Sequence, residues 1–534
     1  MEVAPPATAR LRARETLFAA GVVAAVFLAG YTAVSPHNFA GYDEYVIRTL
    51  ADRLVLAAPY ANRPFNFLWT IPGGLIDPAG FRGFWVVHGL WSWAAGVLVF
   101  VICRRACPGL PLLAPLAAVF TVVWAPSDRA RLTTVTATVY SGATLGTLAA
   151  VALLLEGRAR RRLGLVGAAG VLAYLAIRGH EATLPLLLLA PLLCRLPAVR
   201  TGPPAPAWWT PWAVPVALAL VEAATPALLQ TAPVDYQMHA ARLDPRPGPV
   251  ARRLAVQYGF HLGPLASTPL AELDEARVAA AVAVCVLAIL FGPWRGRPWP
   301  PSRTLAGAAA AGAAAAGLGY GLFTLSHIGR YADRTEFLSG PGIAVALAGL
   351  VLLAARPFPA PARPAVAAAL AAWVVAVGTG RTLALQRYWD VNGRFAAQSG
   401  TLRQLHAVAP DVQPGTLIVL VDGCGAAWPA LFAFRHAVEW QYGPRATGVL
   451  WGAWPFLYPT TFGPDGVRTM PQESIRGPWQ APPTRHGFDQ VVAVQRQPPG
   501  CVVRLARRWP EELPPLPAAA RYEPTARLVG RAFR

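Results

Sequence analysis

Long apolar runs alternate with short polar segments over the first 380 residues of the chain. A helix that crosses the hydrocarbon core of a bilayer needs about 20 predominantly apolar residues. Eleven runs approach or reach this length. The pattern therefore predicts an α-helical polytopic membrane protein, with expected spans at 16–35, 83–103, 110–126, 138–155, 163–177, 182–194, 211–230, 277–293, 304–325, 340–355 and 364–380.

The first run follows three arginines, at Arg10, Arg12 and Arg14, as the apolar core of a signal peptide would. However, Pro36 comes where the run ends, and no A-x-A cleavage motif is evident. We therefore expect an uncleaved helix, with residues 1–15 forming a cytoplasmic N-terminus.

Composition supports the membrane interpretation. Of the 534 residues, 55% are hydrophobic and only 14% are charged, against roughly 25% charged in an average soluble domain. These values argue against an ordinary soluble protein and exclude a disordered chain, which would be poor in apolar residues. The net charge of +20 comes entirely from arginine, because the sequence contains no lysine.

The arginines favour a membrane topology rather than a nucleic-acid surface, because they recur in short groups in every second segment between apolar runs. These groups include 104–105, 158–162, 295–303 and 356–363. Since cytoplasmic loops collect arginine, we expect a multi-pass protein of the cell membrane. Its N-terminus is then cytoplasmic, and the region after the eleventh span is extracytoplasmic.

Residues 381–534 differ in composition and predict a small α/β domain outside the membrane. The run TLIVLVD at 416–422 indicates a buried strand and 402–408 a helix before it, and further strands are expected at 491–495 and 501–506. Proline-rich stretches at 471–484 and 510–517 indicate irregular connections. In an oxidising compartment a Cys424–Cys501 disulfide is plausible. The other four cysteines lie in or beside apolar runs, where they are typical of inert small hydrophobes.

Carboxylates occur in two of the expected outer segments. Asp43 and Glu44 follow the first span, and Asp128 opens the loop after the third. One interpretation is a solvated loop for the pair and a helix cap for Asp128. The other is that these acids converge on one outer cavity, where a carboxylate accepts a proton from a hydroxyl group or, at Asp43 and Asp128, helps to hold a divalent cation such as Mg²⁺ or Mn²⁺.

Basic side chains also gather on the expected outer side. Arg178, His180 and Glu181 stand directly against two apolar runs, where ionisable groups are expensive and tend to be functional. They either pair with one another or face a polar cavity. Arg330 and Arg334 lie four positions apart in the loop before the tenth span, where guanidinium groups suit either a phosphate ligand or lipid headgroups.

Taken in order, these segments resemble the GT-C superfamily of polytopic glycosyltransferases, and are similar to bacterial relatives of the protein O-mannosyltransferases. The resemblance covers about residues 16–380 and depends on order, membrane side and spacing together. The segments are YDEY at 42–45, the Arg63-Pro64 step, Asp128, HEATLPLLLL at 180–189, RYADR at 330–334 and PGIAVALAGL at 341–350.

The resemblance implies a sugar donor linked to polyprenyl phosphate and transfer at the outer membrane face. It implies that Asp43 is the catalytic acid, with Glu44 beside it and Asp128 as a second acid. Arg330 and Arg334 become candidates for the lipid phosphate, and the further substrate-binding candidates are Arg63, Arg178, His180 and Glu181. The sequence departs from the pattern at His180, where lysine is often found, and the C-terminal domain matches no known motif.

We therefore expect hexosyl or pentosyl transfer to an envelope glycan, lipid or protein, with no nucleic-acid partner. The one cofactor considered is a divalent cation. A polysaccharide polymerase or ligase is an alternative, and it would depend on the loop 231–276 with Asp235, His239 and His261. A transporter is a further alternative, although no inverted repeat is visible. A catalytically inactive scaffold for an envelope partner is the last.

Overall fold

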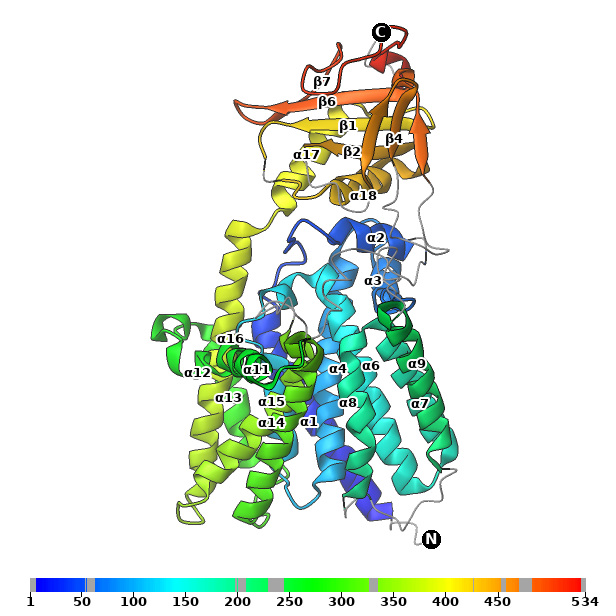
Figure 1. Ribbon diagram of the computed structural model, residues 1–534. Helices are drawn as coiled ribbons and strands as arrows, with labels where there is room; N and C mark the ends of the chain where they lie inside the picture. The colour runs from blue at the N-terminus through cyan, green and yellow to red at the C-terminus, as the bar shows by residue number, and fades with distance from the viewer. Residues whose placement is uncertain are drawn as a thin grey trace.

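The computed structural model describes residues 6–52, 54, 63–196, 199, 208–228, 244–325, 335–425, 427–452, 458–469 and 483–529. Figure 1 shows a bundle of long helices with a small α/β domain at one end. The N-terminus lies at the opposite end of the bundle.

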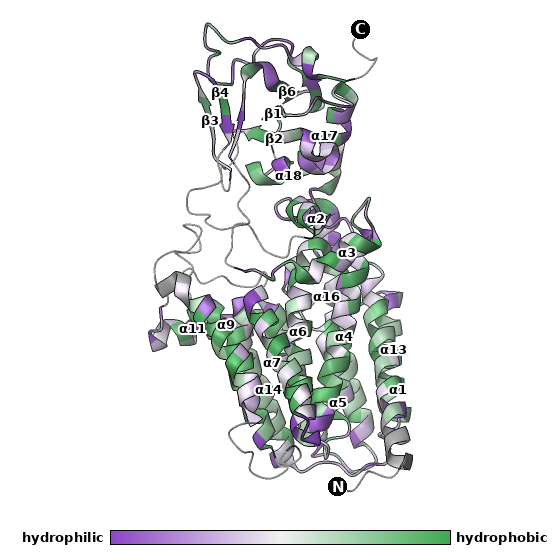
Figure 2. Cartoon of the chain, turned by 90° about the vertical axis from the view of Figure 1, so that its right-hand side faces the viewer, coloured by the Kyte–Doolittle hydropathy of each residue, from purple (hydrophilic) through white to green (hydrophobic). Residues whose placement is uncertain are grey.

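Ten of the eleven expected spans correspond to continuous α-helices. They are α1 (Pro6–Tyr31), α4 (Arg82–Ala106), α5 (Leu113–Val123), α6 (Thr134–Arg160), α7 (Leu163–Gly179), α9 (Thr210–Leu228), α13 (Ala276–Phe291), α14 (Ser302–Leu325), α15 (Glu336–Ala355) and α16 (Arg363–Asn392). By length and composition, six helices in the described part of the chain can cross a membrane, and four more are shorter apolar helices. Figure 2 shows apolar residues over the length of the bundle.

The expected span 182–194 is wrong as a single α-helix. The structure has the six-residue helix α8 (Leu184–Leu189) followed by the 3₁₀ segment η4 (Ala190–Arg195). Pro191 lacks the amide that an α-helix would need at this point. Six residues rise only about 9 Å, so α8 alone is too short to cross a bilayer.

The Ala/Gly-rich run forms α14 and packs tightly against α15. A Cβ atom at Gly312 would lie 2.5 Å from the backbone nitrogen of Ala346, and one at Gly319 would lie 2.7 Å from that of Ser339. Glycine at both positions therefore lets the two backbones approach closely, as is typical of helix contacts in membranes.

The expected α/β domain is confirmed. It contains α17 (Phe395–Val408), β1 (Thr416–Asp422), α18 (Leu431–Tyr442), β2 (Ala446–Trp451), β6 (Val491–Gln497) and β7 (Val502–Leu505). The sheet order is β2-β1-β6-β7, with β1 parallel to β2 and β6, and β7 antiparallel to β6. A second, antiparallel sheet contains β3 (Thr460–Gly463), β4 (Gly466–Thr469) and β5 (Thr484–His486).

Two further details of this domain follow the sequence. The Cys424–Cys501 disulfide is present, with Cα atoms 5.9 Å apart. Residues 510–517 are irregular as expected, while most of 471–484 lies outside the described residues.

The boundary expected at residue 381 falls inside α16, which continues to Asn392 before α17 begins.

The segment between α1 and α4 connects the bundle to this domain. It contains α2 (Glu44–Asp52) and α3 (Ile71–Ile76), which lie between the two parts in Figure 2. The ring of Tyr45 lies 5.7 Å from that of Trp428 and 5.8 Å from that of Trp440. Residues of α2 and of the four-stranded sheet thus belong to one hydrophobic core.

Candidate active site

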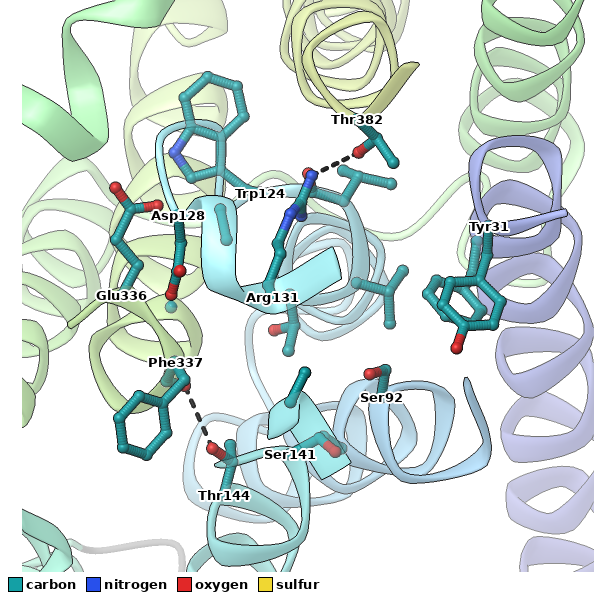
Figure 3. A pocket seen from close by; sticks show the side chains of 18 of the residues that line it. Tyr31, Ser92, Trp124, Asp128, Arg131, Ser141, Thr144, Glu336, Phe337 and Thr382 are labelled. Carbon is teal, nitrogen blue, oxygen red and sulfur yellow. Dashed lines mark hydrogen bonds between the residues drawn. The ribbon is translucent and has the colours of Figure 1, made fainter. Parts of the chain in front are cut away.

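A cavity of about 120 Å³ lies inside the bundle, between α1, α4, α5, α6, α15 and α16 (Figure 3). Its described lining includes two carboxyl groups, from Asp128 and Glu336, and the guanidinium group of Arg131. Most of the remaining lining is apolar or aromatic and includes Val26, Phe27, Ala95 and Val122. The cavity thus combines a charged end with an apolar interior between membrane helices.

Asp128 is brought to the cavity by the turn that follows α5. It occupies the N-cap position of the 3₁₀ segment η2 (Arg129–Leu132), but its side chain makes no capping hydrogen bond there. Only 2% of the residue is exposed. Asp128 therefore gives η2 no capping hydrogen bond, and it is one of the residues that line the cavity.

Glu336 provides a second carboxylate in the same cavity, from the first turn of α15. Its Oε2 accepts a hydrogen bond from the Ser127 amide at 3.4 Å, and the Asp128 amide also donates to the carboxylate. Its Oε1 is buried and has no hydrogen-bond partner among the described residues. A buried oxygen of this kind is available for a ligand or a proton.

Arg131 is the cation of the cavity. Its Nη2 donates to Thr382 Oγ1, and its Nη1 lies 3.5 Å from the Val123 carbonyl oxygen. Its Nε is buried without a hydrogen-bond partner in the described part of the chain. Among the described lining residues, two carboxyl groups stand beside one guanidinium. Burial makes a second negative charge costly unless a proton or another positive group compensates it.

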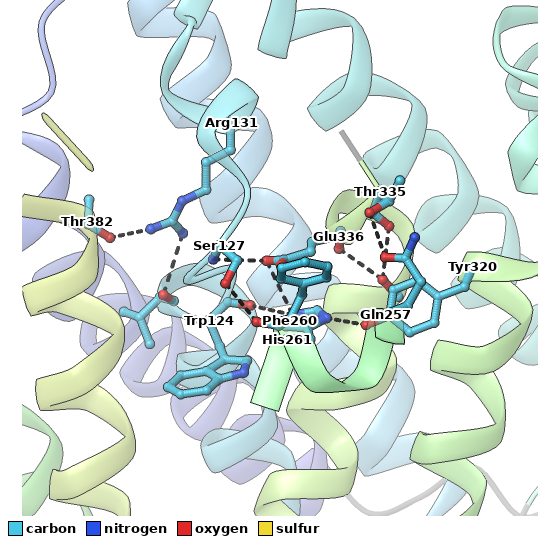
Figure 4. Close-up of polar contacts among 12 residues, drawn as sticks. Trp124, Ser127, Arg131, Gln257, Phe260, His261, Tyr320, Thr335, Glu336 and Thr382 are labelled. Atoms are coloured by element: carbon cyan, nitrogen blue, oxygen red, sulfur yellow. Dashed lines mark hydrogen bonds and ion pairs between the residues drawn. The ribbon is translucent and has the colours of Figure 1, made fainter. Parts of the chain in front are cut away.

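A helix outside the predicted spans covers the Glu336 side of the cavity. This helix, α11 (Pro247–Leu262), packs against α14. Its His261 is fully buried, with Nδ1 bonded to the Tyr320 hydroxyl and Nε2 3.9 Å from Glu336 Oε2 (Figure 4). Burial lowers the pKa of His261 to about 4, so we expect a neutral ring at pH 7.

The first-loop acids lie elsewhere. Glu44 is buried and accepts hydrogen bonds from the amides of Ala40 at 2.7 Å and Gly41 at 3.1 Å, which stabilise the turn before α2. Asp43 is half-buried, and its carbonyl oxygen accepts the Ile47 amide at 2.8 Å, at the start of α2. Neither residue is among those that line the cavity.

Helix α6 explains this separation. Val135 and Val139 belong to the hydrophobic core that includes α2, whereas Ala137 and Thr144 line the cavity. With 3.6 residues per turn, these pairs lie on opposite sides of the helix. The structure therefore does not bring Asp43 and Asp128 to one cavity.

The basic candidates near α7 have partners that the sequence did not indicate. Arg178 forms an ion pair of 3.0 Å with Glu222 of α9, and Arg63 pairs with Glu181 through two hydrogen bonds. Arg178 and Glu181 thus both have ion-pair partners in other segments of the chain. Arg63 and Glu181, both substrate-binding candidates, are brought together.

His180 lies among aromatic rings. Its ring centroid is 5.6 Å from that of Tyr140 and 5.3 Å from that of Phe337, and its Nδ1 accepts the Ala182 amide at 3.4 Å. Burial lowers its pKa to about 3. His180 therefore contacts two of the rings that line the cavity, and is not itself among the lining residues.

The remaining candidates lie outside the described residues: Arg330, Arg334, Asp235 and His239. The described residues contain no cluster of three or more His, Cys, Asp or Glu side chains suited to a metal ion. Asp43 and Asp128, the expected metal ligands, do not share the cavity. These two residues therefore do not fit a metal ion held jointly.

Sequence reasoning missed Glu336 and Arg131, although a signal was present for each. Glu336 is an acid at the beginning of an apolar helix, directly after the arginine-rich loop. Arg131 belongs to the segment SDRAR that supplied Asp128. What the sequence could not show is that these two segments meet.

Comparison of the chain with protein-family models and with curated proteins gives no match. Among solved structures, it is similar to the crystal structure of ArnT from Cupriavidus metallidurans bound to undecaprenyl phosphate. The two share 16% sequence identity with a TM-score of 0.41, over 80% of this chain and 85% of that chain.

Proposed function

We propose that this protein is an integral-membrane glycosyltransferase. It would move a hexosyl or pentosyl group from a polyprenyl-phosphate-linked donor to a cell-envelope acceptor at the outer face of the membrane. The observation that carries the proposal is the cavity, in which Asp128, Glu336 and Arg131 stand at the end of an apolar space between membrane helices.

This arrangement suits the chemistry of glycosyl transfer. The acceptor hydroxyl attacks the anomeric carbon of the sugar, and the bond from that carbon to the phosphate oxygen breaks. A carboxylate can take the hydroxyl proton, while a fixed guanidinium stabilises the charge that gathers on the leaving phosphate. Arg131 is the described candidate, and the predicted Arg330 and Arg334 would add to it. The apolar lining suits part of a polyprenyl chain.

Two observations support transfer at the outer face. Arg104 and Arg105 lie in the last turn of α4, where they pair with Glu15 and Glu156. This end of α4 is opposite the α/β domain (Figure 1). Arginine-rich loops favour the cytoplasmic side. The α/β domain contains a disulfide, which is typical of an oxidising compartment. Asp128 follows the C-terminal end of α5, and Glu336 begins α15. Both of these helix ends are on the domain side of the bundle.

The test is turnover of a labelled undecaprenyl-phosphate sugar by the purified protein in lipid vesicles. We expect release of undecaprenyl phosphate with the parent protein and a loss of at least about 10²-fold for Asp128→Asn. Glu275→Gln is the matched control, because Glu275 is an acid paired with Arg387 and does not line the cavity. Absence of turnover over a panel of hexosyl and pentosyl donors would contradict the proposal.

An envelope polysaccharide polymerase or ligase would use related chemistry. One observation favours this alternative. Helix α11 belongs to the loop 231–276 on which the alternative depends, and it covers the Glu336 side of the cavity. Product length separates the two functions, because a transferase adds one sugar per donor and a polymerase yields a ladder of chains.

A further inference from the structure

We propose that Glu336 is the proton acceptor of this reaction, and thus a catalytic residue. The inference rests on the proposed function and deepens it. Its starting point is the asymmetric environment of the carboxylate. The Ser127 amide lies 3.4 Å from Oε2, whereas Oε1 is buried with no hydrogen-bond partner among the described residues.

This asymmetry is what a general base requires. A base must present one oxygen at a fixed position within hydrogen-bond reach of the hydroxyl that it deprotonates. Backbone amides from the turn at Ser127 hold the carboxylate, so the other oxygen can face the cavity that Glu336 lines. A carboxylate that served only to tether that turn would have no need of an unpaired buried oxygen.

The backbone that carries Glu336 is also well fixed. A Cβ atom at Gly319 of α14 would lie 2.7 Å from the amide nitrogen of Ser339, one turn after Glu336. The Ser339 hydroxyl donates to the carbonyl oxygens of Thr335 and Glu336. The first turn of α15 is therefore held against α14, and this limits the movement of the carboxylate.

The charged and titratable groups around Glu336 come from three elements. Asp128 and Arg131 belong to the turn between α5 and α6, His261 belongs to α11, and Tyr320 belongs to α14. The negative charge of Asp128 favours transfer of a proton to Glu336, and the positive charge of Arg131 disfavours it. Arg131 can, however, pair with the leaving phosphate. Asp128 thus supports the base electrostatically.

The acceptor oxygen forms a bond to the anomeric carbon, and its proton moves to Glu336 Oε1. The bond between that carbon and the phosphate oxygen breaks, and its electron pair leaves with the polyprenyl phosphate. The proton is released to water after the products depart.

The test compares Glu336→Gln with the parent and with Glu275→Gln, using the vesicle assay and a labelled undecaprenyl-phosphate donor. Glutamine retains an oxygen for the Ser127 amide but cannot take a proton. We expect kcat to fall by at least about 10²-fold with KM nearly unchanged, an unchanged melting temperature, and loss of the acid limb of the pH–rate profile. Formate should restore part of the activity of Glu336→Ala, since it can occupy the space of the missing carboxylate.

Each outcome decides the inference. If the parent turns over and Glu336→Gln keeps kcat within about threefold, Glu336 is not the base, although the proposed function survives. A raised KM with unchanged kcat, or a folded alanine variant that formate does not rescue, would equally overturn it. If the parent itself shows no turnover, the proposed function fails and this inference fails with it.

A second variant covers the case in which Glu336→Gln does not fold. Glu336→Asp keeps the carboxylate but withdraws it by one methylene group. We expect it to fold, to lower kcat without raising KM, and to retain the acid limb. Parent-like kcat in Glu336→Asp would contradict a base held at a fixed distance.

Discussion

Arg63 and Glu181 lie 118 positions apart in the chain and form an ion pair through two hydrogen bonds, with Arg63 Nε 2.7 Å from Glu181 Oε2. The pair connects the loop after α2 to the segment after α7. Burial would raise the pKa of Glu181, but the guanidinium outweighs this effect and lowers it to about 2.

This pair predicts an acid-sensitive contribution to stability. Because the pKa of Glu181 is lower in the folded state than its ordinary value of 4.5, the contribution is present above about pH 4.5 and is lost as the pH falls towards 2. Both side chains are partly exposed, so we expect about 1 kcal/mol or less. Melting temperatures of the parent and of Glu181→Gln in detergent should differ at pH 7 and converge at low pH. A constant difference would contradict the prediction.

The two candidate acids Asp43 and Asp128 give a second prediction. The resemblance made Asp43 the catalytic acid, and that role stays a prediction. The cavity contains Asp128 but not Asp43, so we expect Asp128→Asn to lower donor turnover more than Asp43→Asn does, when protein levels are equal. The reverse order would place the reaction centre in the loop that contains Asp43.

Arg330 and Arg334 are tested by exchange for lysine. If they bind the donor phosphate through paired hydrogen bonds, lysine cannot reproduce that geometry, and apparent donor affinity should fall several-fold in each variant. Contact with lipid headgroups predicts no change, since lysine reaches headgroups equally well. Parent-like affinity in both variants would exclude them as the phosphate site.

The disulfide predicts a stable C-terminal domain under oxidising conditions. Cys424 and Cys501 are 77 positions apart. Removing a disulfide typically lowers the free energy of unfolding by about 2–4 kcal/mol. We expect Cys501→Ser to be digested faster than the parent in limited proteolysis, with cleavage within the α/β domain. Cys107→Ser is the control, because Cys107 is a free thiol between α4 and α5. Equal digestion rates of the parent and Cys501→Ser would contradict the expectation.

Membrane sidedness is tested with engineered thiols at two exposed arginines. Arg162 lies between α6 and α7, and Arg521 lies in the α/β domain. A membrane-impermeant maleimide should label Arg521→Cys in intact cells, or in spheroplasts where an outer envelope excludes the reagent, and Arg162→Cys only after permeabilisation. Labelling in the opposite order would place the cavity acids on the cytoplasmic side.

The sequence predicted what depends on local hydrophobic pattern. The strand at 416–422 was expected at the bounds of β1, and ten of the apolar runs became helices. The prediction failed where contacts between segments far apart in the sequence determine the structure. The run at 182–194 is apolar throughout but contains prolines that divide it, and α11 is a mixed-polarity helix whose place is set by contacts of Gln257 and His261 with α14 and the segment before α15.

The site was predictable in part for the same reason. Asp128 could be selected because an acid between two apolar runs is unusual. The partners of Arg178 and Glu181 could not be predicted. Glu222 and Arg63 come from other segments, and the packing of the bundle brings them together. Glu336 was visible as a residue, but only the fold shows that it shares a cavity with Asp128.

The core shared by α2 and the C-terminal sheet has a consequence for biosynthesis. Tyr45 emerges from the ribosome early, whereas its ring partners Trp428 and Trp440 are synthesised almost 400 residues later. During that interval the apolar side of α2 lacks its final covering. A chain that ends before the sheet is therefore left with an uncovered first loop, and chaperones or proteases can distinguish such a product from the completed protein.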